Sequence, residues 1–247
     1  MVMQFKITFL LLLFNLSCFS QTKNTLENLF PSNFGEIVIH NDYTLSYSRS
    51  CQQPEWVIYK LTDDMLSKNK SCKRPNYFKK DDLISDQEAT HYDYTNSGFD
   101  RGHLVPAADM KYNCISYKET FLTSNISPQK HKFNARIWYN LEKQVRDWVK
   151  NKNELYIITG PIISKEDNKI ENTNICIPSY FYKIIIDVKD TNIIAFLLPH
   201  EEEIKEIRHY VVSVDSIELI TDINFFHKIE DEMKDLESEI NIEYWFK

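Results

Sequence analysis

The sequence predicts a single domain of the α+β class, built on a largely antiparallel sheet. Two apolar, β-branched segments, 180–188 and 193–198, are separated by a hairpin-sized turn at 189–192. The segment 134–149 instead repeats its apolar residues at helical spacing. No internal repeat or interior Pro/Gly linker divides the 247 residues, a length that suffices for one domain with a full core.

Local composition predicts the other elements. The expected strands are rich in aromatic and β-branched residues, and Pro106 keeps the residue before it extended. Pro128 stands at the centre of an expected turn. In chain order we expect a strand at 55–61, loop at 67–97, an extended segment at 99–105, a turn at 124–129, a strand at 155–159, a strand at 211–214 and a short helix at 215–220.

The helix expected at 134–149 is amphipathic. Its apolar stripe recurs at spacings of four, four and three residues: Ile137, Leu141, Val145 and Trp148. Asn134 suits the N-cap or first turn of this helix, because its side chain can accept a hydrogen bond from a backbone N–H that the helix leaves without a partner.

Residues 1–20 have the form of a secretory signal peptide. The apolar run 7–14 follows a single Lys and is too short to span a bilayer, and small or polar residues follow it. We expect cleavage near Ser20, which would make the protein secreted or periplasmic. Lipid attachment at Cys18 fits less well, because the residues before it depart from a lipoprotein signal.

Four cysteines follow the leader, at positions 51, 72, 114 and 176. An even number in an oxidising compartment favours two disulfides, with three possible pairings. We expect Cys51 to pair with Cys72 across a local loop, and Cys114 with Cys176 across a long one. No Cys-x-x-Cys occurs, so a thiolate zinc site is not expected.

The formal net charge is −7, but the charge is unevenly distributed. Residues 68–80 hold six basic residues and no acidic one, and residues 130–152 hold seven basic against two acidic. Such stretches are either solvated faces or a basic surface for an anionic partner. The local electrostatic field at a binding surface matters more for the choice of partner than the net charge of the chain. The negative net charge therefore does not exclude nucleic acid as a partner.

The string Asp100-Arg101-Gly102-His103, with Asn134 31 residues later, carries the chemistry. His103 can act as a general base near neutral pH, and Arg101 can bind phosphate. Arg74, in the basic run, is a second phosphate candidate. Asn134 offers either a carboxamide oxygen to a hard cation or a helix cap. The set suits metal-dependent hydrolysis of a phosphodiester.

Glu142 lies two helical turns after Asn134 and leans toward it. At that distance it more plausibly binds a metal-bound water or orients a neighbour than binds the same ion directly. The alternative is an exposed glutamate paired with Lys143 or Arg146. The sequence contains no His-Glu-x-x-His, Gly-x-Ser-x-Gly or Gly-rich phosphate loop, which argues against zincin, serine-hydrolase and nucleotide-driven chemistry.

The string 99–106 (FDRGHLVP) resembles the signature of the DNA/RNA non-specific endonucleases, a family that includes secreted bacterial nucleases and endonuclease G. Further stretches are similar to later family elements: 124–129 (SNISPQ), 134–142, 159–161 (TGP) and 177–183 (IPSYFYK). The resemblance covers roughly residues 54–226. It leaves 21–53 as an N-terminal lead-in and 227–247 as an acidic tail.

This resemblance implies a ββα-metal fold with helices flanking the sheet, and one divalent cation, Mg²⁺ or Mn²⁺. By analogy His103 is the general base, Asn134 is the direct protein ligand of the metal, and Glu142 assists through metal-bound water. Arg101 and Arg74 bind phosphate, and Asn125 shapes the substrate site. The implied substrates are DNA and RNA, cut with little sequence preference. No stable membrane partner is expected.

Two other functions stay open at this point. One is a nucleic-acid-binding or surface module that keeps the fold without catalysis. The other is a metal-dependent phosphodiesterase on small substrates, which needs no long basic groove. The stretch 109–119 has no role that the resemblance supplies.

Overall fold

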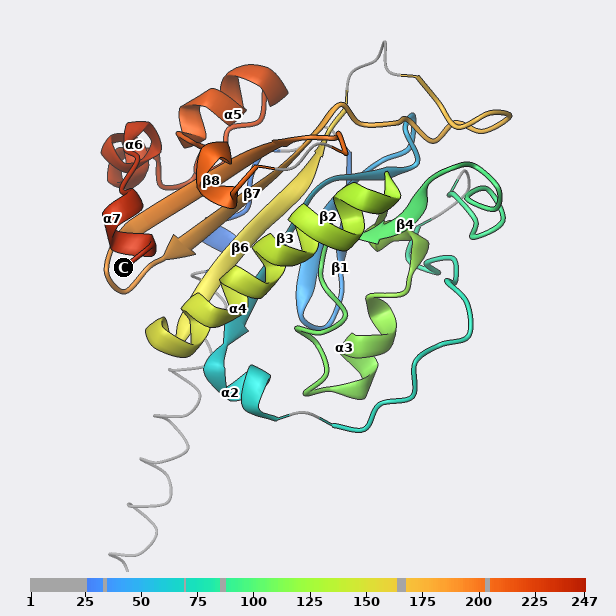
Figure 1. The fold of residues 1–247 in the computed structure, drawn as a ribbon, viewed down its shortest axis with the longest axis horizontal. Coiled ribbons are helices and arrows are strands. Elements are labelled where there is room, and N and C mark those ends of the chain that lie inside the picture. The colour runs from blue at the N-terminus through green and yellow to red at the C-terminus, as the bar shows by residue number, and fades with distance from the viewer. Residues whose placement is uncertain (1–25, 33–34, 69, 85–87, 164–167, 203–204) are drawn as a thin grey trace, which may run out of the picture.

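The computed structural model describes residues 26–32, 35–68, 70–84, 88–163, 168–202 and 205–247. The leader expected at 1–20, with Cys18 and the cleavage position, lies outside them. Within the described residues, seven strands form one antiparallel sheet and two more form a separate ribbon, with helices packed around them (Figure 1). The α+β prediction is thus confirmed.

The seven-stranded sheet has the order β1-β2-β3-β6-β7-β8-β9, and each neighbouring pair is antiparallel. The strand expected at 55–61 lies within β3, and the expected hairpin is β7–β8. The bounds are β1 (Glu36–Ile39), β2 (Tyr43–Ser48), β3 (Gln53–Thr62), β6 (Glu154–Ile162), β7 (Tyr180–Asp187), β8 (Asn192–Pro199) and β9 (Val211–Val212). The two-stranded ribbon is β4 (Asp100–His103) with β5 (Ile126–Gln129).

Helices cover both faces of the large sheet. Their bounds are α2 (Asp63–Ser67), α3 (Cys114–Glu119), α4 (Tyr139–Lys152), α5 (Val214–Thr221), α6 (Glu230–Ser238) and α7 (Ile242–Trp245). A π-helical segment, Phe133–Trp138, leads directly into α4. In the described part of the chain, no helix is both long and apolar enough to cross a membrane.

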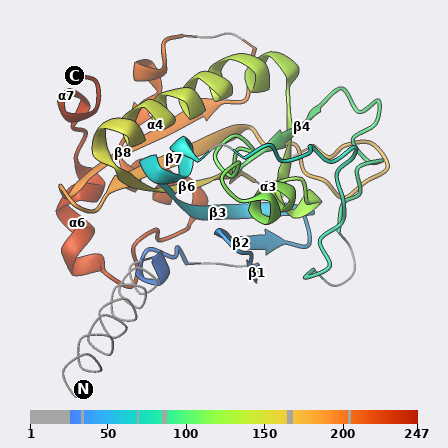
Figure 2. The ribbon, with the colours of Figure 1, turned by 90° about the horizontal axis from the view of Figure 1, so that it is seen from below.

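The large sheet is buried on both faces. Alternate residues of β3 point to opposite cores: Val57 and Tyr59 face the α4 side, whereas Trp56 and Ile58 face the other side. The α4 side also receives Trp245 of α7, and the opposite side is covered by α5 and α6. Figure 2 shows α4 and α6 on opposite sides of the strands.

The segments on either side of residues 54–226 also form strands and helices. Residues of the lead-in form β1 and β2, which continue the sheet, and Tyr43 and Leu45 are fully or almost fully buried. Residues of the acidic tail form α6 and α7, whose Met233 and Trp245 enter the two cores. Both flanking segments are therefore integral to the fold.

One local prediction was wrong, and one of the two positions offered for Asn134 is excluded. Residues 126–129 form strand β5 rather than a turn, and Pro128 pairs with Arg101 in a ribbon of only two strands, where a missing N–H is tolerated. Asn134 is not an N-cap: its own backbone N–H donates to the carbonyl oxygen of Lys130, so it already lies inside the helix. That position leaves its side chain available for another role.

The expected disulfide pairing was also wrong. Among the described residues the bonds join Cys51 to Cys176 and Cys72 to Cys114. The first ties the turn after β2 to the chain before β7. The second ties the basic segment that holds Arg74 to the start of α3. The expectation paired Cys51 with its nearest cysteine in the sequence. The order of the strands instead brings residues 51 and 176 together.

Candidate active site

The β4–β5 ribbon fixes the backbone of the motif. His103 pairs with Ile126 and Gly102 with Ser127. A Cβ added at Gly102 would lie 2.2 Å from the side chain of Gln129, so only glycine lets that amide pack across the strand. Both polar atoms of the Gln129 side chain are buried, and neither has a hydrogen-bond partner among the described residues. Gln129 thus contributes an unsatisfied amide directly beside the motif.

The helix that follows lies along this ribbon. The indole N–H of Trp138 donates to the carbonyl oxygen of His103 at 3.2 Å. One turn earlier, Nδ2 of Asn134 donates to the carboxylate of Asp100 at 3.0 Å, and His131 Nδ1 lies 2.9 Å from the same oxygen. No described residue donates to Oδ1 of Asn134, which leaves a neutral oxygen of the kind hard cations prefer.

His200 anchors the start of that helix. Its Nε2 accepts from the backbone N–H of Lys130 at 2.6 Å, and its Nδ1 donates to the carbonyl oxygen of Pro178 at 2.8 Å. Burial lowers its pKa to about 4, so the ring stays neutral and keeps this arrangement. His200 is therefore a structural histidine that fixes the start of the helix.

His103 lies among aromatic rings. Its ring centroid is 5.3 Å from that of Phe78 and 5.0 Å from that of Phe121, the latter edge-on. Its Nε2 is buried and has no hydrogen-bond partner in the described part of the chain. Burial, and then the charge of Arg74, lower the pKa of His103 to about 4. The imidazole is therefore neutral near pH 7 and able to accept a proton.

Arg74 and Arg101 meet the same aromatic pair. The Arg74 guanidinium lies 5.1 Å from the centre of the Phe121 ring, and that of Arg101 lies 6.0 Å from Phe78. Arg101 also donates to the carbonyl oxygen of His91 and is half-buried, whereas Arg74 is exposed. A cavity of about 240 Å³ is lined by both arginines and both rings. The structure thus brings together both predicted phosphate ligands and His103.

Glu142 belongs to a buried charge cluster below the helix. Asp109 pairs with Arg146 at 2.9 Å and accepts from the Tyr59 hydroxyl at 3.1 Å. Arg146 lies 3.9 Å from Glu142. Burial raises the pKa of Glu142 above its ordinary value and lowers the pKa of Lys183 below its ordinary value. Additional positive charge nearby would favour the ionised glutamate.

Asn125 lies beneath the site and is fully buried. Its Oδ1 accepts from the N–H of Val105 at 2.9 Å, and its Nδ2 donates to the carbonyl oxygens of Val105 and Thr120. Every polar atom of the side chain is thereby used within the protein. The structure places Asn125 where it holds the backbone two residues after His103, not where a substrate would touch it.

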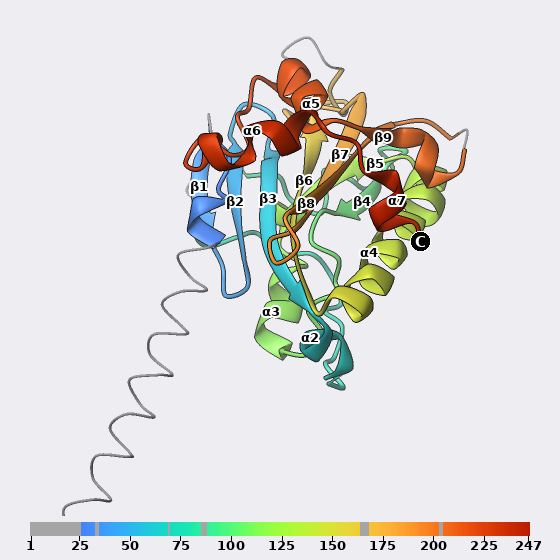
Figure 3. The ribbon, with the colours of Figure 1, turned by 90° about the vertical axis from the view of Figure 1, so that its left-hand side faces the viewer.

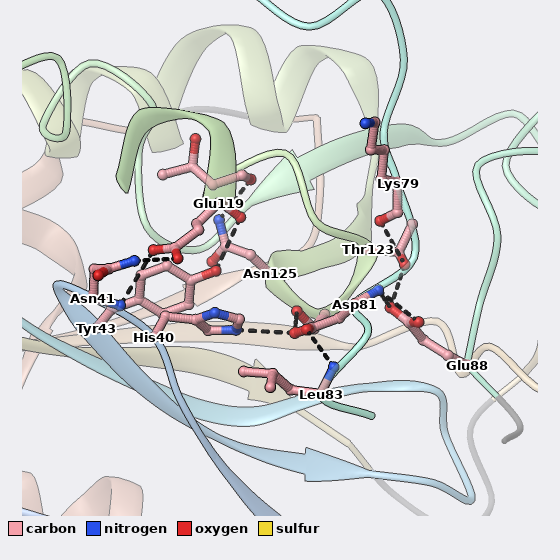
Figure 4. A network of polar contacts seen from close by, with 12 residues as sticks. His40, Asn41, Tyr43, Lys79, Asp81, Leu83, Glu88, Glu119, Thr123 and Asn125 are labelled. Atoms are coloured by element: carbon pink, nitrogen blue, oxygen red, sulfur yellow. Dashed lines mark hydrogen bonds and ion pairs between the residues drawn. The ribbon is translucent and has the colours of Figure 1, made fainter. Parts of the chain in front are cut away.

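A polar network supports this part of the chain from below (Figure 4). His40, which follows β1, lies 2.9 Å from the carboxylate of Asp81, and Asp81 accepts from Ser124 at 2.6 Å. The carboxylate of Glu88 accepts from the Asp81 N–H and from Thr123. Thr123 and Ser124 directly precede Asn125, so the network fixes the turn that holds the motif.

Comparisons with known proteins show the family of this chain. The family model of the DNA/RNA non-specific endonucleases matches residues 21–232. The chain belongs to this family. It is therefore a sugar-non-specific endonuclease, a hydrolase of phosphodiester bonds, and the resemblance stated from the motif is confirmed.

The chain is similar to known nucleases in sequence and in structure. The nuclease of Nostoc sp. is 30% identical over 219 residues, covering 83% of this chain and 77% of its own. Nuclease C1 of Cunninghamella echinulata var. echinulata is 30% identical over 217 residues, covering 81% and 86%. The crystal structure of an EndoG/EndoGI complex matches with a TM-score of 0.75 and 29% identity, covering 83% of this chain and 90% of that one. This match confirms the ββα-metal fold.

The sequence analysis did not identify three charged residues that surround Glu142. Asp109 stands in the stretch that had no assigned role, Arg146 was considered only as a surface partner of Glu142, and Lys183 lies on β7. Asp109 and Lys183 interact although they are 74 residues apart in the sequence, so no local sequence pattern predicts the cluster. A larger cavity of about 760 Å³ lies elsewhere and contains none of the predicted site residues.

Replacement of Asn125 with alanine is expected to lower the free energy of unfolding by about 2–3 kcal/mol, because it leaves buried backbone groups without partners. Urea denaturation measures the loss, with Asn151→Ala, an exposed asparagine of α4, as the control. Unchanged stability together with a raised KM would instead indicate a direct substrate contact.

Proposed function

We propose that this endonuclease cuts both DNA and RNA internally, with little sequence preference, in a reaction that depends on one divalent cation, Mg²⁺ or Mn²⁺. The observation that supports it is a cavity lined by Arg74, Arg101 and the two aromatic rings that pack against His103. Asn134, on the adjoining helix, donates a hydrogen bond to Asp100 in the same ribbon. None of these contacts would read a base edge, which fits a lack of sequence preference.

In this proposal His103 takes a proton from the attacking water, because burial keeps its ring neutral. Arg74 and Arg101 bind the phosphate and offset its growing negative charge. Trp138 and the β5 pairing hold the backbone of His103, and Asn125 holds the chain after it. These fixed contacts keep the base in position before substrate arrives.

The residues present fit a hard divalent cation. Asn134 would hold it through Oδ1, the atom that its bond to Asp100 leaves exposed to a ligand. Burial raises the pKa of Glu142, and a nearby cation would favour its ionised form. Glu142 would assist through a metal-bound water. When bound, the ion would add positive charge that stabilises the developing charge on the phosphate.

We further propose that the enzyme acts outside the cytoplasm, as a secreted or periplasmic protein. The signal-like residues 1–20 and the two disulfides support this location, since disulfides persist in oxidising compartments. Fractionation of the culture medium, periplasm and cytoplasm tests this location. We expect the protein in the medium or the periplasm, with an N-terminal sequence that begins near Gln21. Recovery of the uncleaved chain in the cytoplasm would contradict it.

The test of activity is incubation of the mature protein with circular plasmid and with RNA, in Mg²⁺, Mn²⁺ or EDTA. We expect loss of both substrates with either metal and none with EDTA, and conversion of plasmid to linear and short products shows internal cutting. Cleavage of mononucleotide esters alone would favour the small-substrate phosphodiesterase. Absence of any cleavage by the folded, metal-supplied protein would leave a binding module.

A further inference from the structure

Three carboxylates gather on the face of the sheet opposite α4. Asp215 and Glu218 stand one turn apart on α5, and Glu237 stands on α6, which packs against α5. Each offers a carboxylate oxygen, and these oxygens lie within 4.8 Å of one another. Figure 3 shows α5 and α6 apart from α4, so the cluster is separate from the candidate active site.

Glu237 provides the main evidence that this cluster binds a cation. It is only 7% exposed, and within the described structure it has no hydrogen bond or ion pair. It stands in the last turn of α6, which holds no basic residue, where the helix dipole disfavours a negative charge. Burial, and then Glu218, Asp215 and Glu230, raise its pKa to about 7. A buried carboxylate without a partner is costly unless a cation or a proton neutralises it.

The geometry suits calcium better than magnesium. Ca²⁺ takes oxygen ligands at about 2.3–2.6 Å in flexible arrangements, so two of its ligands can lie up to about 5 Å apart. Mg²⁺ demands ligands at about 2.0–2.1 Å in a near-ideal octahedron and usually keeps several waters. We propose that Asp215, Glu218 and Glu237 bind one structural Ca²⁺ that joins α5 to α6. This site goes beyond the nuclease function and does not depend on it.

Thermal unfolding of the mature protein during a calcium titration tests the site. The titration is done in the Asn134→Ala background, so that binding at the candidate active site does not contribute. We expect the Tm to rise by about 5 °C once calcium exceeds its Kd 100-fold. Magnesium at the same concentrations is expected to give a smaller rise.

The variant Glu237→Gln, in the same background, is expected to abolish the calcium-dependent rise and to raise the Tm in EDTA, because it removes the repelling charge. Asp235→Asn removes one negative charge from the same helix at an exposed position and should keep the full rise. Should Glu237→Gln fail to fold, Asp215→Asn, which alters an exposed ligand, is expected to show the same loss.

Two results would overturn the proposal. One is an equal calcium-dependent rise with and without the Glu237→Gln substitution, which places the ion elsewhere. The other is no rise in the Asn134→Ala protein, which means that a shared proton alone neutralises the cluster.

Discussion

Replacing His103 with alanine is expected to lower kcat/KM on plasmid DNA and on RNA alike by about 10²- to 10⁴-fold, the usual range for loss of a general base. The fold should persist, because the β4–β5 pairing and the Trp138 contact use the backbone of His103 and not its ring. Initial rates at saturating Mg²⁺ and a urea denaturation curve measure the two effects separately.

The matched control is His227→Ala, which removes an exposed histidine outside the site and should leave the rate unchanged. A His103→Ala rate within a few-fold of the wild-type rate would remove the imidazole from the mechanism. A large loss confined to one nucleic acid would instead place His103 in substrate selection, since the proton transfer is the same for both substrates.

The low pKa of His103 gives this prediction a pH dependence. The folded-state pKa of about 4 lies below the ordinary value of 6.5, so the fold favours the neutral ring. The associated stability is complete above pH 6.5 and is lost as the pH falls from there through about 4. An NMR titration of the metal-free protein should show the ring of His103 still neutral at pH 5.5, whereas a midpoint near 6.5 would mean that the ring is solvated.

The sequence predicts the parts of the molecule whose signals are local. The apolar stripe of the helix, the β7–β8 hairpin and the strand expected at 55–61 are each encoded in at most about twenty consecutive residues, and all three are present in the structure. The motif itself is readable because its residues are consecutive in the sequence: Gly102 leaves room for the side chain of Gln129, and Pro106 keeps the residue before it extended.

The parts that the sequence does not predict depend on contacts between distant residues. Pro128 indicates a turn by composition, yet pairing with β4 makes its segment a strand. The cysteine pairing depends on which strands become neighbours, which spacing does not encode. Asp109 and Arg146 are 37 residues apart, and they become partners because the fold places the turn that holds Asp109 beside α4. Buried polar networks of this kind are specified by the tertiary fold.

Asn134→Ala is expected to lower activity at least about 100-fold at physiological Mg²⁺ and to weaken metal binding, since it removes the only protein ligand that the proposal gives the ion directly. Part of the activity should return as Mg²⁺ is raised, because water can take the place of the lost carboxamide and Glu142 still acts through metal-bound water. Calorimetric titration of Mg²⁺ and rates across a Mg²⁺ series measure the two quantities.

The control for this variant lies on the same helix. Asn140→Ala removes an exposed carboxamide and should change neither metal binding nor rate. Asn134→Ala also frees the carboxylate of Asp100 from one donor, so Asp100→Asn should be measured beside it. If Asn134→Ala lowers the rate while Mg²⁺ binds with wild-type affinity, the carboxamide acts by orienting Asp100 and His131. If affinity and rate fall together and excess Mg²⁺ restores the rate, then Asn134 is the ligand, because only a lost ligand is compensated by mass action.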